Sequence, residues 1–129
     1  MLSRFLDRQV LRLCGSILSH PLPALLARGV ACALCNDDPA ILGQDTAGMT
    51  HDFWQALQGW QNLGLAGLGS LAENSVRWAN FEDQTTDQWA QGIRDGVVGA
   101  GVKGQRLQAW AVEWERFCLW IVTEYGDDA

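Results

Sequence analysis

Residues 30–44 read VACALCNDDPAILGQ, and the fold of the chain is decided in this stretch. It begins as a short run of small and apolar residues, with Gly29 before it and an Asn-Asp-Asp-Pro turn after it. A short apolar run with such boundaries is typical of a parallel β-strand that is buried on both faces. We therefore predict a strand over residues 30–35, with Asp37 and Asp38 directly after its carboxyl end.

Cys32 and Cys35 are separated by two residues, which is a spacing that many zinc sites use. A complete zinc site needs further ligands at a short spacing of their own, and Cys14 and Cys118 each stand alone. In a strand, residues i and i+3 point to opposite faces, so the sulfur atoms of Cys32 and Cys35 would diverge. The cysteines are therefore predicted to be reduced thiols buried in the core.

Composition and charge narrow the possible partners. The chain has 129 residues, of which 48% are hydrophobic and 19% charged, as in a globular domain. A net charge of -6 disfavours nucleic acid and anionic membranes as partners. Charged side chains recur through residues 1–16, too often for a secretory signal, and no apolar run is long enough for a membrane span. We expect neither nucleic acid nor a membrane as a partner. The location stays unknown, with the cytoplasm as the default.

Most of the remaining chain is predicted to be helical. A short helix should begin at Pro21 or Pro23 and end at Gly29, and another around Trp89 should have Thr86 as its N-cap. Residues 96–104 (GVVGAGVKG) are predicted to form a glycine-rich linker. The clearest helix is the last, because its apolar residues recur every three or four positions on one face. These residues are Leu107, Trp110, Trp114, Phe117, Cys118, Ile121 and Tyr125.

Two further patterns have ordinary structural explanations. His51 and Asp52 could form a catalytic pair, but the sequence offers no nucleophile to accompany them, so a position at the start of a helix is favoured. Residues 64–69 (GLAGLG) invite comparison with a dinucleotide-binding loop, but they follow a predicted helix instead of a strand. Neither pattern explains how the predicted strand at residues 30–35 finds the neighbours that its backbone groups require.

A set of short motifs resembles the adenosine deaminase family in order and spacing. The motifs are His20-Pro21, Gly29-Val30, Asn36-Asp37-Asp38-Pro39, Gly48, Asp52-Phe53 and Leu71–Trp78. The likeness is greatest to the branch of adenosine deaminase-related growth factors as found in fungi. It covers roughly residues 11–125 and leaves out an atypical start at residues 1–10.

The resemblance implies an α/β fold by lineage. The chain would be the C-terminal fragment of a (β/α)₈ TIM barrel, mostly helical here, with residues 30–35 as the eighth strand. Such barrels have about 250 residues, so residues 1–129 would form a single partial domain. The seven missing strands would then explain why the predicted strand has no neighbours in this chain.

The resemblance also implies a zinc-dependent hydrolysis of adenosine to inosine and ammonia. Carried over to this sequence, Asp37 is the metal ligand and Asp38 is the substrate-binding residue that contacts the purine. The family's histidine ligands and its catalytic glutamate and histidine fall in segments that this chain lacks. His20 matches the family's structural His-Pro, and His51 stands where the family more often has tyrosine, so neither replaces them.

A single carboxylate does not hold catalytic zinc, because such sites use at least three protein ligands. The chain alone is therefore expected to be inactive, to retain no zinc and to contain no catalytic residue. A complementing chain, or self-association through exposed apolar helices, would be its expected partner. The alternative is a non-enzymatic helical module that binds another protein through its tryptophan-lined faces.

Overall fold

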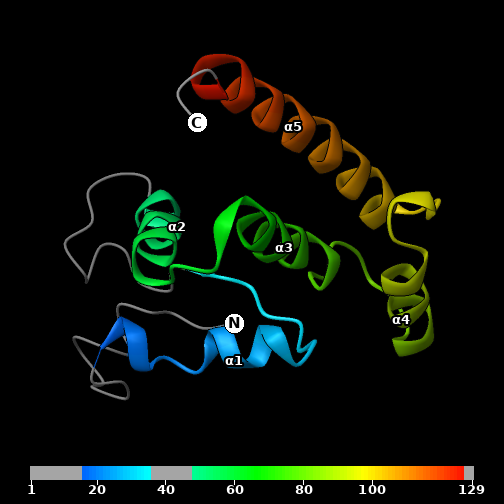
Figure 1. Ribbon diagram of the computed structural model, residues 1–129. Coiled ribbons are helices and arrows are strands. Elements are labelled where there is room, and N and C mark those ends of the chain that lie inside the picture. The colour runs from blue at the N-terminus through cyan, green and yellow to red at the C-terminus, as the bar shows by residue number, and fades with distance from the viewer. Residues whose placement is uncertain (1–15, 36–47, 127–129) are drawn as a thin grey trace. The chain divides into compact units, whose positions relative to one another are not determined.

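The structure is a computed structural model that describes residues 16–35 and 48–126 (Figure 1). The chain divides into two compact units, Met1–Ser75 and Val76–Ala129. In chain order, the described elements are the 3₁₀-helix η2 (Ile17–Ser19), α1 (Leu22–Ala27), α2 (Gly48–Gly59), α3 (Gly64–Arg77), α4 (Thr86–Asp95), the 3₁₀-helix η3 (Gly96–Val98) and α5 (Val102–Tyr125). Cys14, Asp37, Asp38 and the atypical start at residues 1–10 lie outside the described residues.

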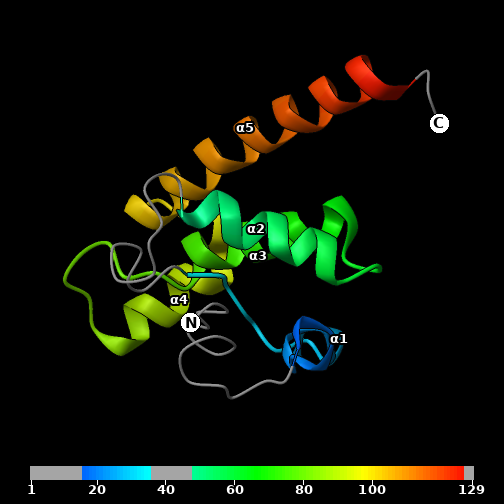
Figure 2. The ribbon, with the colours of Figure 1, turned by 90° about the vertical axis from the view of Figure 1, so that its left-hand side faces the viewer.

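The core of the first unit lies among α1, α2 and α3 (Figures 1 and 2). Three leucines, Leu22, Leu34 and Leu71, are at most 2% exposed. Full burial of a leucine side chain stabilises a fold by about 1.5–3 kcal/mol. The buried cluster consists of Leu22, Cys32, Leu34, Ala56, Trp60 and Leu71.

The short helix that the prolines predict is confirmed as α1. Pro21 precedes its first residue, and Gly29 follows it with a φ of 76°, a left-handed conformation that favours glycine. The preceding turn, η2, is held to the core because the Trp60 indole nitrogen donates a hydrogen bond to the Ile17 carbonyl oxygen at 2.9 Å. These contacts fix the chain immediately before residues 30–35.

The predicted strand at residues 30–35 is wrong. Leu34 alone is assigned to a β-bridge, and the part of the chain that the structure describes contains no strand. The segment still alternates like a strand, since Cys32 and Leu34 both enter the core cluster. A ladder requires a neighbouring row of N–H and C=O groups, which the described helices do not supply. The mostly helical character is confirmed, whereas the TIM barrel stays a prediction.

In the second unit, two cations bind the carboxyl ends of helices. The Arg77 guanidinium donates to the Ile93 carbonyl oxygen in the last turn of α4 at 2.8 Å. Lys103 Nζ, from the first turn of α5, donates to the Arg77 carbonyl oxygen at the end of α3 at 2.9 Å. Carbonyl groups at a helix C-terminus lack partners within the helix and carry partial negative charge, so both contacts are favourable.

Lys103 is only 3% exposed, which is rare for a lysine. Burial lowers the pKa of its ammonium group, and the nearby Arg77 charge lowers it further. The ammonium nitrogen also lies 5.1 Å from the centroid of the Trp89 ring, within the range of a cation–π interaction. The buried cation therefore joins α3, α4 and α5 at one point of the second unit.

The N-cap of α4 is Thr85 instead of the predicted Thr86. The Thr85 hydroxyl accepts the Gln88 N–H at 3.3 Å, and the Gln88 amide oxygen accepts the Thr85 N–H at 3.0 Å. This is a complete capping box, which satisfies two backbone donors reciprocally. Both residues suit the N-cap position equally well, so only the reciprocal contact with Gln88 distinguishes them.

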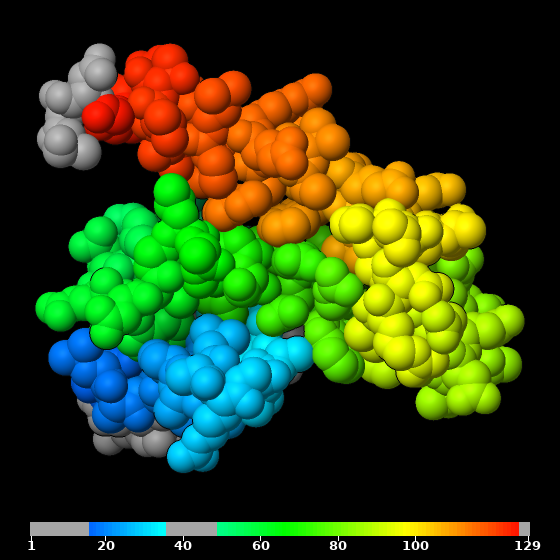
Figure 3. Space-filling model, turned by 45° about the vertical axis from the view of Figure 1, so that its right-hand side comes forward, coloured from blue at the N-terminus to red at the C-terminus, as the bar shows by residue number. Residues whose placement is uncertain are grey.

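The glycine-rich stretch 96–104 is compact. It includes η3 and the first turn of α5, and its atoms pack against α4 and the start of α5 (Figure 3). A Cβ atom on Gly104 would overlap with the carbonyl oxygen of Gly99, so the backbones approach as closely as glycine permits. Glycine at this position is therefore a packing requirement.

The long C-terminal helix is confirmed as α5, a single uninterrupted helix (Figures 1 and 2). Four aromatic residues of the predicted face belong to a row of ring contacts that also includes Trp120, which the prediction did not contain. Successive ring centroids are 5.5 to 6.0 Å apart along the row Trp110, Trp114, Phe117, Trp120 and Tyr125. Over residues 16–35 and 48–126, no helix is both long and apolar enough to cross a membrane.

Gly104→Ala is expected to lower the free energy of unfolding by about 1–3 kcal/mol, because the added methyl group meets backbone that cannot rotate away. Gly92→Ala is the matched control, since a Cβ there would lie 3.5 Å from Lys103 Cδ, an ordinary contact. That variant should be neutral or gain up to about 1 kcal/mol from helix propensity. Urea unfolding followed by circular dichroism measures both, and equal losses would contradict the close approach at Gly104.

Candidate functional site

The candidate site begins where the described part of the extended segment ends, at Cys35. Asp37 and Asp38, the predicted metal ligand and substrate-binding residue, follow it and lie outside the described residues. Leu34 and Cys35 are 2% and 4% exposed. The core of the first unit therefore holds the chain up to Cys35, the last described residue before Asp37 and Asp38.

Asn74 fastens this segment to α3. Its side-chain amide nitrogen donates a hydrogen bond to the Cys32 carbonyl oxygen at 3.0 Å, across 42 positions of sequence. The contact supplies a partner for a backbone group in an extended segment that has no ladder. Only the resemblance had drawn attention to residues 71–78, and no rule of spacing or composition identifies Asn74 as the anchor.

His20 has a structural role. It is 7% exposed, and its Nδ1 atom accepts the Leu22 backbone N–H at 3.1 Å, which satisfies a donor at the start of α1. The His20 ring also packs against the Trp60 ring, with centroids 5.9 Å apart. The contacts agree with the structural role that the His-Pro motif implies.

His51 and Asp52 do not behave as a catalytic pair in α2. The His51 ring pairs with the Gln55 side-chain amide and stacks on Trp54 with centroids 6.2 Å apart, so it is engaged along its own helix. Asp52 is 2% exposed, and neighbouring positions in a helix point about 100° apart. The interpretation of His51 as an ordinary residue near a helix start is favoured.

The cysteine pair follows the prediction of core thiols. Cys32 and Cys35 are buried, whereas Cys118 on α5 is half-buried. Burial raises the pKa of the Cys32 thiol, because a thiolate loses its hydration in the core. Across residues 16–35 and 48–126, no three His, Cys, Asp or Glu side chains come together in a way that could hold a metal ion. The described residues therefore do not fit a complete zinc site.

The first unit contains two pockets that the sequence did not predict. One, of about 370 Å³, is lined by Met49, Thr50, Phe53, Trp54, Leu57 and Leu68 from α2 and α3. The other, of about 580 Å³, lies between α1 and α3 and is lined in part by Leu26, Trp60 and Leu63. Both are largely apolar, so they provide packing surface instead of catalytic groups.

Known proteins were compared with the chain. It is 28% identical over 114 residues to adenosine deaminase 2-A of Danio rerio, which covers 87% of this chain and 19% of that protein. It is 34% identical over 80 residues to the adenine deaminase of Zymomonas mobilis (62% of this chain, 23% of that protein). It is 40% identical over 75 residues to the adenine deaminase of Streptomyces coelicolor (57% of this chain, 20% of that protein). No family model and no solved structure matches.

These similarities support a relationship to the adenosine deaminase family, as the motifs had indicated. The chain spans about a fifth of the length of the curated relatives that it matches.

Asn74→Ala is expected to reduce the free energy of unfolding by about 1–3 kcal/mol, because the Cys32 carbonyl loses its donor in a part-buried position. Gln58→Ala, at an exposed position of α2, is the control and should change stability by less than about 0.5 kcal/mol. The measurement is urea unfolding by circular dichroism. Identical stabilities for the two variants would show that Asn74 anchors nothing.

Alkylation by iodoacetamide should distinguish the cysteines. In the native protein, Cys118 should react faster than Cys32 and Cys35, because both are buried and the Cys32 thiol has a raised pKa. In about 8 M urea, which unfolds the protein, the three cysteines should react at similar rates. Peptide mapping by mass spectrometry gives the rate for each residue. Protection of Cys32 and Cys35 by added zinc, with release by a chelator, would contradict the core-thiol interpretation.

Proposed function

We propose that this chain belongs to the adenosine deaminase family and is the C-terminal fragment of an adenosine deaminase-like zinc hydrolase, which converts adenosine to inosine and ammonia. The similarity over 87% of the chain to adenosine deaminase 2-A is the observation that carries the proposal. We also place it in the growth-factor branch, nearest to the fungal members, on the motifs quoted above.

In this proposal, Asp37 is one ligand of the zinc ion and Asp38 contacts the purine. Support comes from the described residues before Asp37, because the buried Leu34 and the Asn74 hydrogen bond to the Cys32 carbonyl oxygen hold residues 32–34 against the core. A site positioned by packed backbone keeps its side chains within the narrow tolerance that catalysis needs. The fold around the turn would then be the supporting part of a shared active site.

The described residues bring no three His, Cys, Asp or Glu side chains together, so they do not hold a complete zinc site by themselves. In this proposal, a complementing chain supplies the other ligands. When bound, the zinc supplies an activated water for attack on the purine ring. The chain's own contribution is to present two carboxylates at the end of an extended segment. The isolated chain is therefore proposed to be inactive, and a complementing chain that supplies the rest of the barrel would restore the site.

A chimaera tests these roles. The matching fifth of adenosine deaminase 2-A is replaced by this chain, and the product should bind zinc and convert adenosine to inosine. Asp37→Ala should lower the zinc content, because a ligand is removed, whereas Asp38→Asn should keep zinc and reduce kcat/KM by about 100-fold or more. Metal analysis and an inosine assay are the measurements.

Asp83→Asn is the matched control for the chimaera, since Asp83 is an exposed carboxylate in the loop before α4. It should leave zinc content and turnover unchanged. The isolated chain should show neither zinc nor turnover. An active isolated chain would overturn the proposed inactivity, and zinc retention in the Asp37→Ala chimaera would overturn the proposed ligand.

The second candidate is the non-enzymatic helical module, and α5 favours it. Three side chains near its end are well exposed, at 67% for Leu119, 66% for Val122 and 58% for Tyr125. Apolar side chains on several sides of one helix are typical of a helix that becomes covered. A chimaera that folds but binds no zinc, together with concentration-dependent association of the isolated chain in sedimentation, would favour this module.

A further inference from the structure

An open groove lies wholly within the second unit, between the end of α3 and the first turns of α4. Its volume is about 340 Å³, at the lower end of the range of roughly 300–1,000 Å³ that ligand pockets occupy. The lining residues are Trp78, Asn80, Gln84, Thr86 and Trp89, which we call the Trp78 groove. Its size suits one or two small rings.

The two tryptophans that line the groove are held in place by neighbouring side chains. Trp78 meets Trp89 edge to face, with centroids 5.8 Å apart and planes at 67°. The Lys103 ammonium lies over the Trp89 ring and is itself hydrogen-bonded to the Arg77 carbonyl. A ring fixed in this way loses little conformational entropy when a ligand binds. Trp78 is 45% exposed, so part of its surface remains available.

The polar lining of the groove is neutral. Asn80, Gln84 and Thr86 provide amide and hydroxyl groups, each of which can both donate and accept hydrogen bonds. The Gln84 amide nitrogen donates to Glu82 Oε1 at 3.1 Å, which restricts the orientation of that amide. No charged side chain lines the groove, so nothing in it matches a phosphate or a carboxylate.

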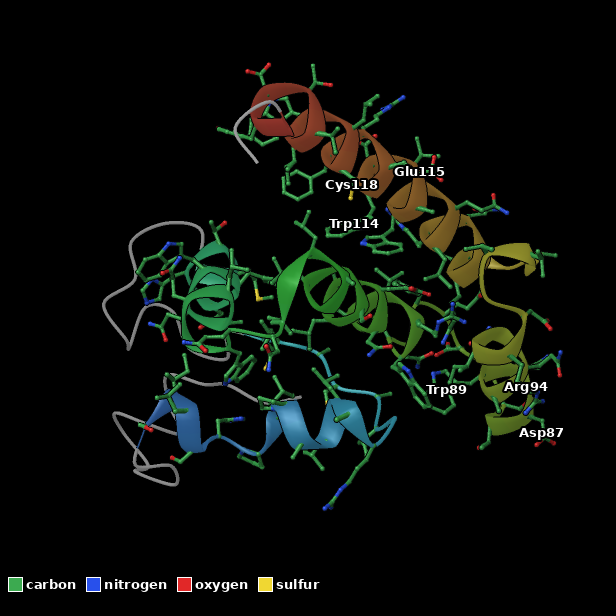
Figure 4. All side chains as sticks on the ribbon, in the orientation of Figure 1. Asp87, Trp89, Arg94, Trp114, Glu115 and Cys118 are labelled. Carbon is green, nitrogen blue, oxygen red and sulfur yellow. The ribbon has the colours of Figure 1, made fainter. Side chains whose placement is uncertain are left out.

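Acidic side chains surround the groove without lining it. Glu82 and Asp83 fall between two lining residues in the sequence, and Asp87 directly follows a third. All three are exposed, and Asp87 projects from a different side of α4 than Trp89 does (Figure 4). Their field disfavours an anionic ligand. The Lys103 ammonium group already lies over the Trp89 ring. Its positive charge would repel a cationic ligand in the groove.

We propose that the Trp78 groove binds a neutral saccharide, as a monosaccharide unit or a short oligosaccharide. A sugar ring carries an apolar face of C–H groups, which can stack on an exposed indole, and a rim of hydroxyl groups, which can exchange hydrogen bonds with amides and hydroxyls. The groove offers both surfaces side by side and no charge. The proposal does not rest on the deaminase chemistry, because neither Asp37 nor Asp38 lines the groove. Trp78 is the last residue of the Leu71–Trp78 motif, but the proposal uses only its exposed ring.

The test is titration of the full chain with glucose, cellotriose and chitotriose, followed by calorimetry and by ¹H–¹⁵N spectra of the indole N–H groups. Saturable binding is expected for at least one of them, with a Kd of about 1 mM because the groove is open. Trp78→Ala should weaken that binding by about fivefold to tenfold through loss of the stacking surface. Glucuronate, an anionic counterpart of glucose, should bind more weakly than glucose.

Trp120→Ala is the matched control, because Trp120 is 49% exposed in the same unit and lies outside the groove. It should leave saccharide binding unchanged. Asn80→Ala, at an exposed loop position, keeps the test decisive if Trp78→Ala fails to fold, and it should also weaken binding. The proposal is overturned if no neutral saccharide binds, if Trp78→Ala and Asn80→Ala bind normally, or if adenosine binds through Trp78 and the saccharides do not.

Discussion

The backbone of residues 30–35 must find hydrogen-bond partners although it lies against an apolar core, and this constraint governs the first unit. Leu34 is 2% exposed, so its neighbourhood cannot rely on water. The Asn74 amide, donating to the Cys32 carbonyl, supplies one partner from α3. Removing α3 from this position would leave the extended segment without that partner.

A comparable constraint operates in the second unit, where a buried cation substitutes for an apolar core residue. Lys103 is acceptable at 3% exposure because its ammonium group meets a helix C-terminus and an aromatic ring. The same contacts immobilise Trp89 and, through it, Trp78. Structural support and the rigidity of the Trp78 groove therefore depend on one set of residues, so a change at Lys103 should affect both.

The similarity to deaminases covers 87% of this chain and 19% of adenosine deaminase 2-A. Within the described residues, the segment 30–35 keeps a strand-like alternation although no strand forms there, because Cys32 and Leu34 both enter the core cluster. Side-chain burial follows from the spacing of apolar residues, whereas a strand also requires backbone partners.

The amino-acid sequence by itself determined the helices. Proline and glycine at the ends of α1, and the apolar period of α5, depend on local backbone sterics and on spacing, which a sequence displays directly. It also determined the alternation of Cys32 and Leu34 and the motif order that relates the chain to deaminases. The Thr85 cap was missed by one residue, because adjacent threonines have equal local preference.

Only the tertiary structure decided which polar groups meet. The contact of Asn74 with Cys32 spans 42 positions, and that of Lys103 with Arg77 spans 26, distances over which no periodicity or spacing rule operates. Whether residues 30–35 became a strand likewise depended on neighbours elsewhere in space. Strand formation and cation burial are non-local, since their stability comes from partners that chain order does not specify.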